Sequence, residues 1–148
     1  NELLLLTLQI DMNRTFHKRI TIRGCVMAVL PAAMSFWCFW VRTGAMPVAG
    51  FALLVLATTA IERLIHTTYT FTADGMLTIR NGHLAKPRSI SVADITGTRK
   101  AGGMLLVASH IIIEYGVGHI TSVQPDNEKA FLAELRRRLD NIDNPNEK

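Results

Sequence analysis

The chain has 148 residues, of which 49% are hydrophobic and 19% charged, and its formal net charge is +4. Residues 24–61 contain one charged side chain, Arg42, whereas the rest of the chain has the charge density of an ordinary soluble domain. This uneven distribution argues against a wholly soluble globule, a disordered tail and a small secreted protein stabilised by disulfides.

The leucine-rich residues 1–12 precede the basic residues, which is the reverse of the order in a signal peptide. We expect this segment to be an extended gene start or a vector remnant, with a short amphipathic interfacial helix as the alternative.

Basic residues cluster on either side of the apolar region. The membrane-flanking cations that we predict are Arg14, Lys18, Arg19, Arg23 and Arg63. Such placement is typical of the cytoplasmic ends of membrane spans. Although the pI is about 9.4, this distribution predicts a lipid bilayer as the partner and no nucleic acid.

Two uncharged runs, residues 24–41 and 43–61, are each long enough as a helix to cross the ~30 Å hydrocarbon core. We expect spans over about 24–41 and 44–61, joined by a tight turn near Arg42 and Gly44. The region 13–65 then forms a hairpin in a bacterial inner (cytoplasmic) membrane, with both chain termini in the cytoplasm. A hydrophobic hairpin buried inside a soluble protein is the alternative.

From residue 66 the hydrophobic pattern has period two, which predicts antiparallel strands. The predicted strands are residues 67–72, 76–80, 89–92, 95–99, 104–108, 110–115 and 119–123. Asp74-Gly75 and residues 116–118 are turn signals.

A helical pattern follows Pro125-Asp126, with one apolar face formed by Phe131, Leu132, Leu135 and Leu139. We predict an α+β chain in which the hairpin precedes a seven-stranded antiparallel β-barrel (residues 66–140) capped by this helix. Residues 141–148 are predicted to be a disordered tail.

Residues 61–75, Ile-Glu-Arg-Leu-Ile-His-Thr-Thr-Tyr-Thr-Phe-Thr-Ala-Asp-Gly, resemble the small membrane-anchored form of the bacterial pleckstrin-homology-like (PH-like) domain family. A second set of residues resembles the same family, namely Ile111 to Gly116, His119, Ser122, Pro125, Asn127-Glu128 and Phe131-Leu132. The resemblance covers residues 14–140. It implies a PH-like barrel and no catalytic residues.

Eukaryotic relatives of that family bind phosphoinositides through several cations at the first β-hairpin. Here we take that turn to be Ala73-Asp74-Gly75, which is short and acidic, with Arg80 as the nearby cation. Because a phosphate needs clustered cationic donors, we expect no specific phosphoinositide binding.

The remaining candidates in the sequence are metal ligands and catalytic residues. His66, His110 and His119, with Asp94 or Glu114, lack the close ligand spacing of metal sites, and we predict no metal and no cofactor. Because no serine has a nucleophile motif and no phosphate-binding loop is present in the sequence, we predict that the protein is not an enzyme. An enzyme acting at the barrel mouth through His110 or His119 is a third hypothesis.

Glu62 and Arg63 directly follow the second span without a linker, so the barrel is expected close to the inner leaflet. We interpret them as markers of the lipid–water boundary, in preference to an ion pair between hairpin and barrel. The run Arg136, Arg137, Arg138 is a candidate for interaction or lipid contact, with a solvated helix end as the alternative.

The hypothesis that fits these features is a non-enzymatic interaction or scaffold module at the inner membrane. We expect self-association through small residues of the second span, which are Gly44, Ala49, Gly50 and Ala52. The alternative is an accessory regulatory subunit whose hairpin docks on a larger membrane transporter or enzyme.

Overall fold

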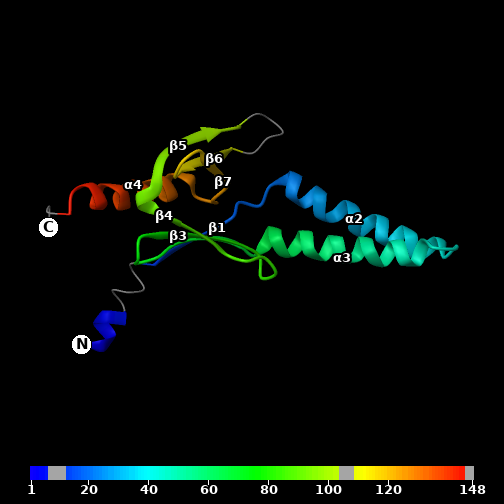
Figure 1. Cartoon of the computed structure of the whole chain (residues 1–148). Coiled ribbons are helices and arrows are strands. Elements are labelled where there is room, and N and C mark those ends of the chain that lie inside the picture. Colours follow the sequence, from blue (N-terminus) through cyan, green and yellow to red (C-terminus); the bar gives the residue numbers. More distant parts are fainter. Residues whose placement is uncertain (7–12, 104–108, 146–148) are drawn as a thin grey trace.

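A computed structural model of the chain describes residues 1–6, 13–103 and 109–145. Its most prominent feature is a pair of long helices, α2 (Ile22–Val41) and α3 (Met46–Ile65), which project from one end of a small β-rich domain (Figure 1). Residues 2–6 form a short helical segment with exposed side chains. Each long helix has 20 residues and is apolar and long enough to cross a membrane. Only 11% of each apolar window is buried, unlike the core helix of a soluble protein.

The turn between the helices is at the predicted place. Arg42 caps α2 in the left-handed conformation with φ of 46°, and Gly44 also has a positive φ of 53°. Pro47 lies in the first turn of α3, where its missing N–H costs nothing. The predicted helices are confirmed, with α3 extending four residues beyond the expected end at residue 61.

Small residues bring the two helices into close contact. Gly50 lies so near α2 that an added Cβ would be 3.3 Å from the Ser35 carbonyl oxygen and 3.2 Å from the Cys38 Cβ. The Ser35 hydroxyl donates a 2.7 Å hydrogen bond to the Gly50 carbonyl. Gly50 therefore packs inside the hairpin and Gly44 lies in its turn, whereas Ala49 and Ala52 are exposed.

The described residues form seven strands, which are antiparallel and lie in two sheets. The first sheet has the order β1-β2-β3-β4 and the second β5-β6-β7. The strands are β1 (Arg14–His17), β2 (Thr67–Phe71), β3 (Met76–Asn81), β4 (Arg88–Ser91), β5 (Ile95–Ala101), β6 (His110–Tyr115) and β7 (His119–Val123). The short helix η1 (Val92–Asp94) turns the chain from β4 into the second sheet. Among the described residues, the two sheets do not close into the predicted continuous barrel, but the PH-like fold fits.

Strand β1 was not predicted. It precedes the helical hairpin yet pairs with β2, which follows it, in the register Arg14↔Phe71 to His17↔Thr68. The cations near these residues had indicated instead that they flank the membrane hairpin. The strand predicted at residues 104–108 lies outside the described residues. The seven described strands are therefore β1 and six of the seven predicted ones.

Helix α4 (Glu128–Asp143) covers the open side of the two sheets and completes the core. Phe131 and Leu135 are buried, while Leu132 and Leu139 are partly buried against the same core, which confirms the predicted apolar face. The helix is capped by Asn127, whose side chain accepts from the Ala130 N–H at 3.0 Å. It continues through Asp143, into the segment predicted to be disordered.

We predict that Gly50→Leu separates α2 from α3, because the larger side chain has no room beside Ser35 and Cys38. Overpacking of this kind costs about 1–3 kcal/mol. The measurement is the rate at which a thiol reagent modifies Cys38, which is buried, in detergent-solubilised protein carrying Cys25→Ser. A cost of about 1.4 kcal/mol, in the lower half of that range, corresponds to a factor of ten. We therefore expect the rate of Cys38 modification to increase by about tenfold.

The matched control is Ala49→Leu, which adds a larger side chain at the neighbouring exposed position. An equal increase in Cys38 reactivity in both variants would contradict the packing role of Gly50.

Candidate functional site: the junction between hairpin and domain

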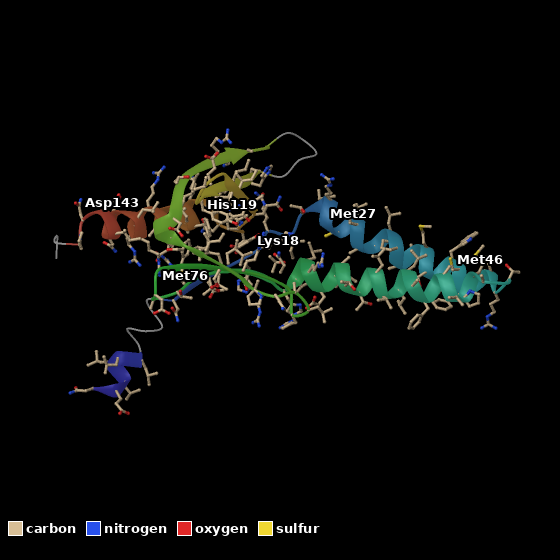
Figure 2. All side chains as sticks on the ribbon, viewed as in Figure 1. Lys18, Met27, Met46, Met76, His119 and Asp143 are labelled. Atoms are coloured by element: carbon tan, nitrogen blue, oxygen red, sulfur yellow. The ribbon has the colours of Figure 1, made fainter. Side chains whose placement is uncertain are left out.

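The helical hairpin is inserted between two paired strands of the domain. Residues 18–21 connect β1 to α2, and His66 alone connects α3 to β2. The Lys18 N–H donates to the Thr67 carbonyl at 3.0 Å, so pairing continues to the base of the hairpin. Lys18 lies between the domain and the helices in Figure 2, whereas Met46 marks the far end of the hairpin.

The same junction also joins the two sheets. The Arg19 N–H donates to the Gln124 carbonyl at 2.8 Å, and the Asp126 N–H donates to the His17 carbonyl at 2.9 Å. The Gln124 N–H in turn donates to the Tyr69 hydroxyl at 3.1 Å. Because β1 and its continuation contact both β2 and the end of β7, the base of the hairpin is held by both sheets.

A polar contact holds the end of α3 against the loop that follows β3. The Glu62 Oε1 accepts a 2.5 Å hydrogen bond from the His83 backbone N–H and lies 3.2 Å from the His83 Nδ1. The Gly82 N–H donates to the His66 carbonyl at 3.3 Å. Glu62 therefore contacts the domain, which contradicts its interpretation as a boundary marker alone. Arg63 is exposed, and for it that interpretation stays a prediction.

Glycine is required at position 82. Its φ is +80°, and a Cβ there would lie 2.6 Å from the Glu62 Oε2. Glu62 stands out in the sequence but its partner does not, because nothing in a single sequence relates His83 to a helix that ends 18 positions earlier. The one local signal is the Asn81-Gly82 pair directly after the strand predicted at residues 76–80, and a turn signal of this kind does not point to Glu62.

Four of the five predicted membrane-flanking cations lie around the base of the hairpin. Arg19, Arg23 and Arg63 are exposed and Lys18 is half-buried. Lys18 and Arg63 line a groove between α2 and α3 whose other walls are mostly apolar. Arg14 lies instead at the opposite end of β1, next to α4.

The arginines of α4 surround a buried carboxylate. The Glu134 side chain is 1% exposed, and its Oε1 lies 2.8 Å from the Arg138 Nε and 3.0 Å from the Arg137 Nη2. The Arg14 Nη1 lies 3.3 Å from the Glu134 Oε2. Burial raises the pKa of the Glu134 carboxyl, but the hydrogen bonds from the arginines outweigh it and hold that pKa below its usual value.

These contacts limit what the predicted run at residues 136–138 can do. Arg138 is 12% exposed, donates to the Thr72 carbonyl and lies over the Phe71 ring at 5.3 Å. Arg136 and Arg137 are exposed, but the end of α4 points away from the hairpin (Figure 1). Asp143 and Met46 accordingly lie at opposite ends of the molecule in Figure 2. Contact of Arg136 or Arg137 with lipid or another partner stays a prediction.

Histidines singled out in the sequence lie apart. His66 caps α3 at the junction, while His110 begins β6 and His119 begins β7. The His119 ring stacks on Tyr115 across the turn at 5.6 Å. Within the described residues, the only group of at least three His, Cys, Asp or Glu side chains with neighbouring ligand atoms is Glu62, His66 and His83.

Residues 67–139 match the family model described as a bacterial PH domain. This segment is a bacterial PH domain. The match begins at β2 and ends inside α4, so β1 and the hairpin lie outside the matched residues. No curated protein and no solved structure was found to match the chain.

Because β1 is the first strand of the sheet, the first turn of the PH domain lies between β1 and β2. Residues 73–75, taken above as the first β-hairpin, join the second and third strands of the sheet. The first connection, between β1 and β2, is the helical hairpin itself. The short acidic turn at residues 73–75 is therefore not the first turn of the domain, and the absence of specific phosphoinositide binding stays a prediction.

We predict that Glu134→Gln destabilises the PH domain by about 3 kcal/mol at neutral pH, because it removes the buried negative charge that accepts from Arg138 and Arg137. The measurement is urea unfolding of the detergent-solubilised chain, followed by the circular dichroism of the β-sheets. Because the folded-state pKa of Glu134 is lowered, its stabilisation is complete above the usual carboxyl range. It is lost as pH falls through the folded-state pKa, so the variant and the parent protein should converge in strong acid.

The matched control is Arg137→Ala, which removes an exposed partner of the same carboxylate and should cost less than about 1 kcal/mol. Equal losses in the two variants would contradict a role for the buried pair.

Proposed function

We propose that this chain is an integral membrane protein in which the hairpin crosses the inner membrane twice and presents its PH domain at the cytoplasmic face as a non-enzymatic interaction module. The observation that supports this most directly is the insertion of two exposed, apolar helices between β1 and β2. Two short covalent connections, residues 18–21 and His66, join the helices to one sheet. Such a domain has no flexible tether, so it would meet its partners at a fixed height above the bilayer.

The side chains along the hairpin support this orientation. The cations Lys18, Arg19, Arg23 and Arg63 lie at the base beside the domain, and Arg42 is the one basic residue at the far turn. Near that turn, Phe36, Trp37 and Trp40 are at least 70% exposed, as expected of aromatic residues at a membrane interface. The excess of cations beside the domain favours the cytoplasm for the PH domain and both termini.

A labelling experiment tests this topology. In a Cys25→Ser, Cys38→Ala background, Thr43→Cys places a thiol at the hairpin tip and Asp74→Cys places one on the exposed β2–β3 turn. We expect an impermeant maleimide to label Thr43→Cys in spheroplasts, and to label Asp74→Cys only after the membrane is disrupted. The reverse pattern would contradict the orientation, and release of the protein by carbonate without detergent would contradict membrane spanning.

We propose self-association as the mode of action. Gly50 packs inside the hairpin and is not accessible to a second copy. Ala49 and Ala52 are exposed small residues on α3, and they permit close approach of a second helix in lipid. The second candidate, an accessory subunit of a transporter or enzyme, is favoured by another feature. The start of α2 has an open apolar surface, lined by eight residues between positions 20 and 33, against which a helix of another protein can pack.

One purification distinguishes the two candidates. We expect tagged protein, extracted from its native membrane in mild detergent, to elute as an oligomer of itself by mass photometry. Ala52→Leu should then reduce the oligomer, whereas Ala33→Leu, on the exposed face of α2, should leave it intact. A second protein at fixed ratio, lost with Ala33→Leu, would support the accessory subunit. Monomer alone would contradict self-association.

A further inference from the structure

Three side chains that can bind a metal meet where α3 contacts the loop after β3. Glu62 and His66 are four residues apart, so they share one face at the end of α3, and His83 comes from the loop. One ligand atom from each of the three lies within 4.8 Å of the other two. The two imidazole rings have centroids 4.5 Å apart at an interplanar angle of 59°.

The Glu62 carboxylate has an unsatisfied oxygen at this place. Its Oε1 accepts the His83 backbone N–H, but its Oε2 is buried without a hydrogen-bond partner among the described residues. A carboxylate oxygen withdrawn from water without a donor or a cation is costly. Both histidine side chains are exposed, so an ion can reach the cluster from solvent.

We propose that Glu62, His66 and His83 bind a divalent transition-metal ion of the Zn²⁺ type. Two imidazoles and one carboxylate are a ligand set that Zn²⁺ accepts, with the fourth position left to water. Ligands 2.0–2.1 Å from a tetrahedral ion are separated by about 3.3 Å. The 3.2 Å between the Glu62 Oε1 and the His83 Nδ1 matches that separation. Ca²⁺ and Mg²⁺ prefer six or more oxygen ligands and are not expected to bind here.

Backbone contacts position the ligands without the ion. His83 is held through its own N–H to Glu62, and His66 through its N–H to the Glu62 carbonyl at 2.9 Å. The glycine at position 82 allows the loop to approach Glu62 closely. An ion bound here links the end of α3 to the loop between β3 and β4 of the first sheet, and so it fixes the orientation of the PH domain relative to the hairpin.

The test is a Zn²⁺ titration of the full-length protein in detergent, with a tag that contains no histidine and after removal of metal by chelator. Calorimetry should show one Zn²⁺ per chain, and Co²⁺ should give the intense visible absorption of a tetrahedral site. His66→Ala and His83→Ala should each weaken Zn²⁺ binding by about 100-fold or more, since loss of a ligand exceeds the 10–100-fold effect of an outer-shell change. Both variants keep the backbone bonds described above and are expected to fold.

His119→Ala is the matched control, because it removes an exposed histidine that stacks on Tyr115 away from the cluster. It should bind Zn²⁺ as the parent protein does. Zn²⁺ affinity that is unchanged in the His66→Ala, His83→Ala double variant would overturn the site, as would the absence of stoichiometric binding at millimolar Zn²⁺. The titration is made in detergent and does not depend on the proposed membrane topology, so its failure would leave that proposal intact.

Discussion

The pairing of β1 with β2 is the constraint on which the rest of the structure depends. Neighbouring strands lie ~4.8 Å apart, whereas packed helices lie about 8–10 Å apart. The strands that enter and leave the hairpin are paired with each other, so residues 18–21 and His66 must accommodate this difference over a very short distance. Hydrogen bonds at the base leave little freedom: Lys18 and Arg19 donate to β2 and to the end of β7, and Glu62 accepts from the loop after β3.

The same strand links the hairpin to the far side of the domain. Arg14 begins β1 and contacts Glu134 in the last helix, while Phe16 packs edge-on against Phe131 at a ring distance of 5.4 Å. A displacement of the hairpin would therefore disturb contacts with α4 through four residues of β1. This arrangement favours a domain that acts as one body with its hairpin over a domain tethered to a membrane.

Insertion of the hairpin into the first connection also explains how the family match relates to the fold. The bacterial PH domain match starts at β2, and β1 is separated from β2 by the whole hairpin. The domain is complete only when residues 14–17 are added. A segment 67–139 taken alone would make β2 an edge strand, paired with β3 only, and expose the core face that Phe16 covers.

The sequence by itself determined the elements that depend on local patterns. The two apolar helices, the tight turn at Arg42, six of the described strands and the apolar face of α4 follow from hydrophobic period, length and turn residues. The role of residues 14–17 did not follow, because strand pairing between positions more than 50 residues apart leaves no trace in a single sequence, and the cations suggested a flank. Only the tertiary structure placed His83 beside Glu62 and His66, surrounded Glu134 with arginines from two elements, and assigned Gly50 to the inside of the hairpin. Each of these is a contact between distant segments, and the physical requirement that creates it, such as a buried charge or a missing Cβ, exists only after the chain has folded.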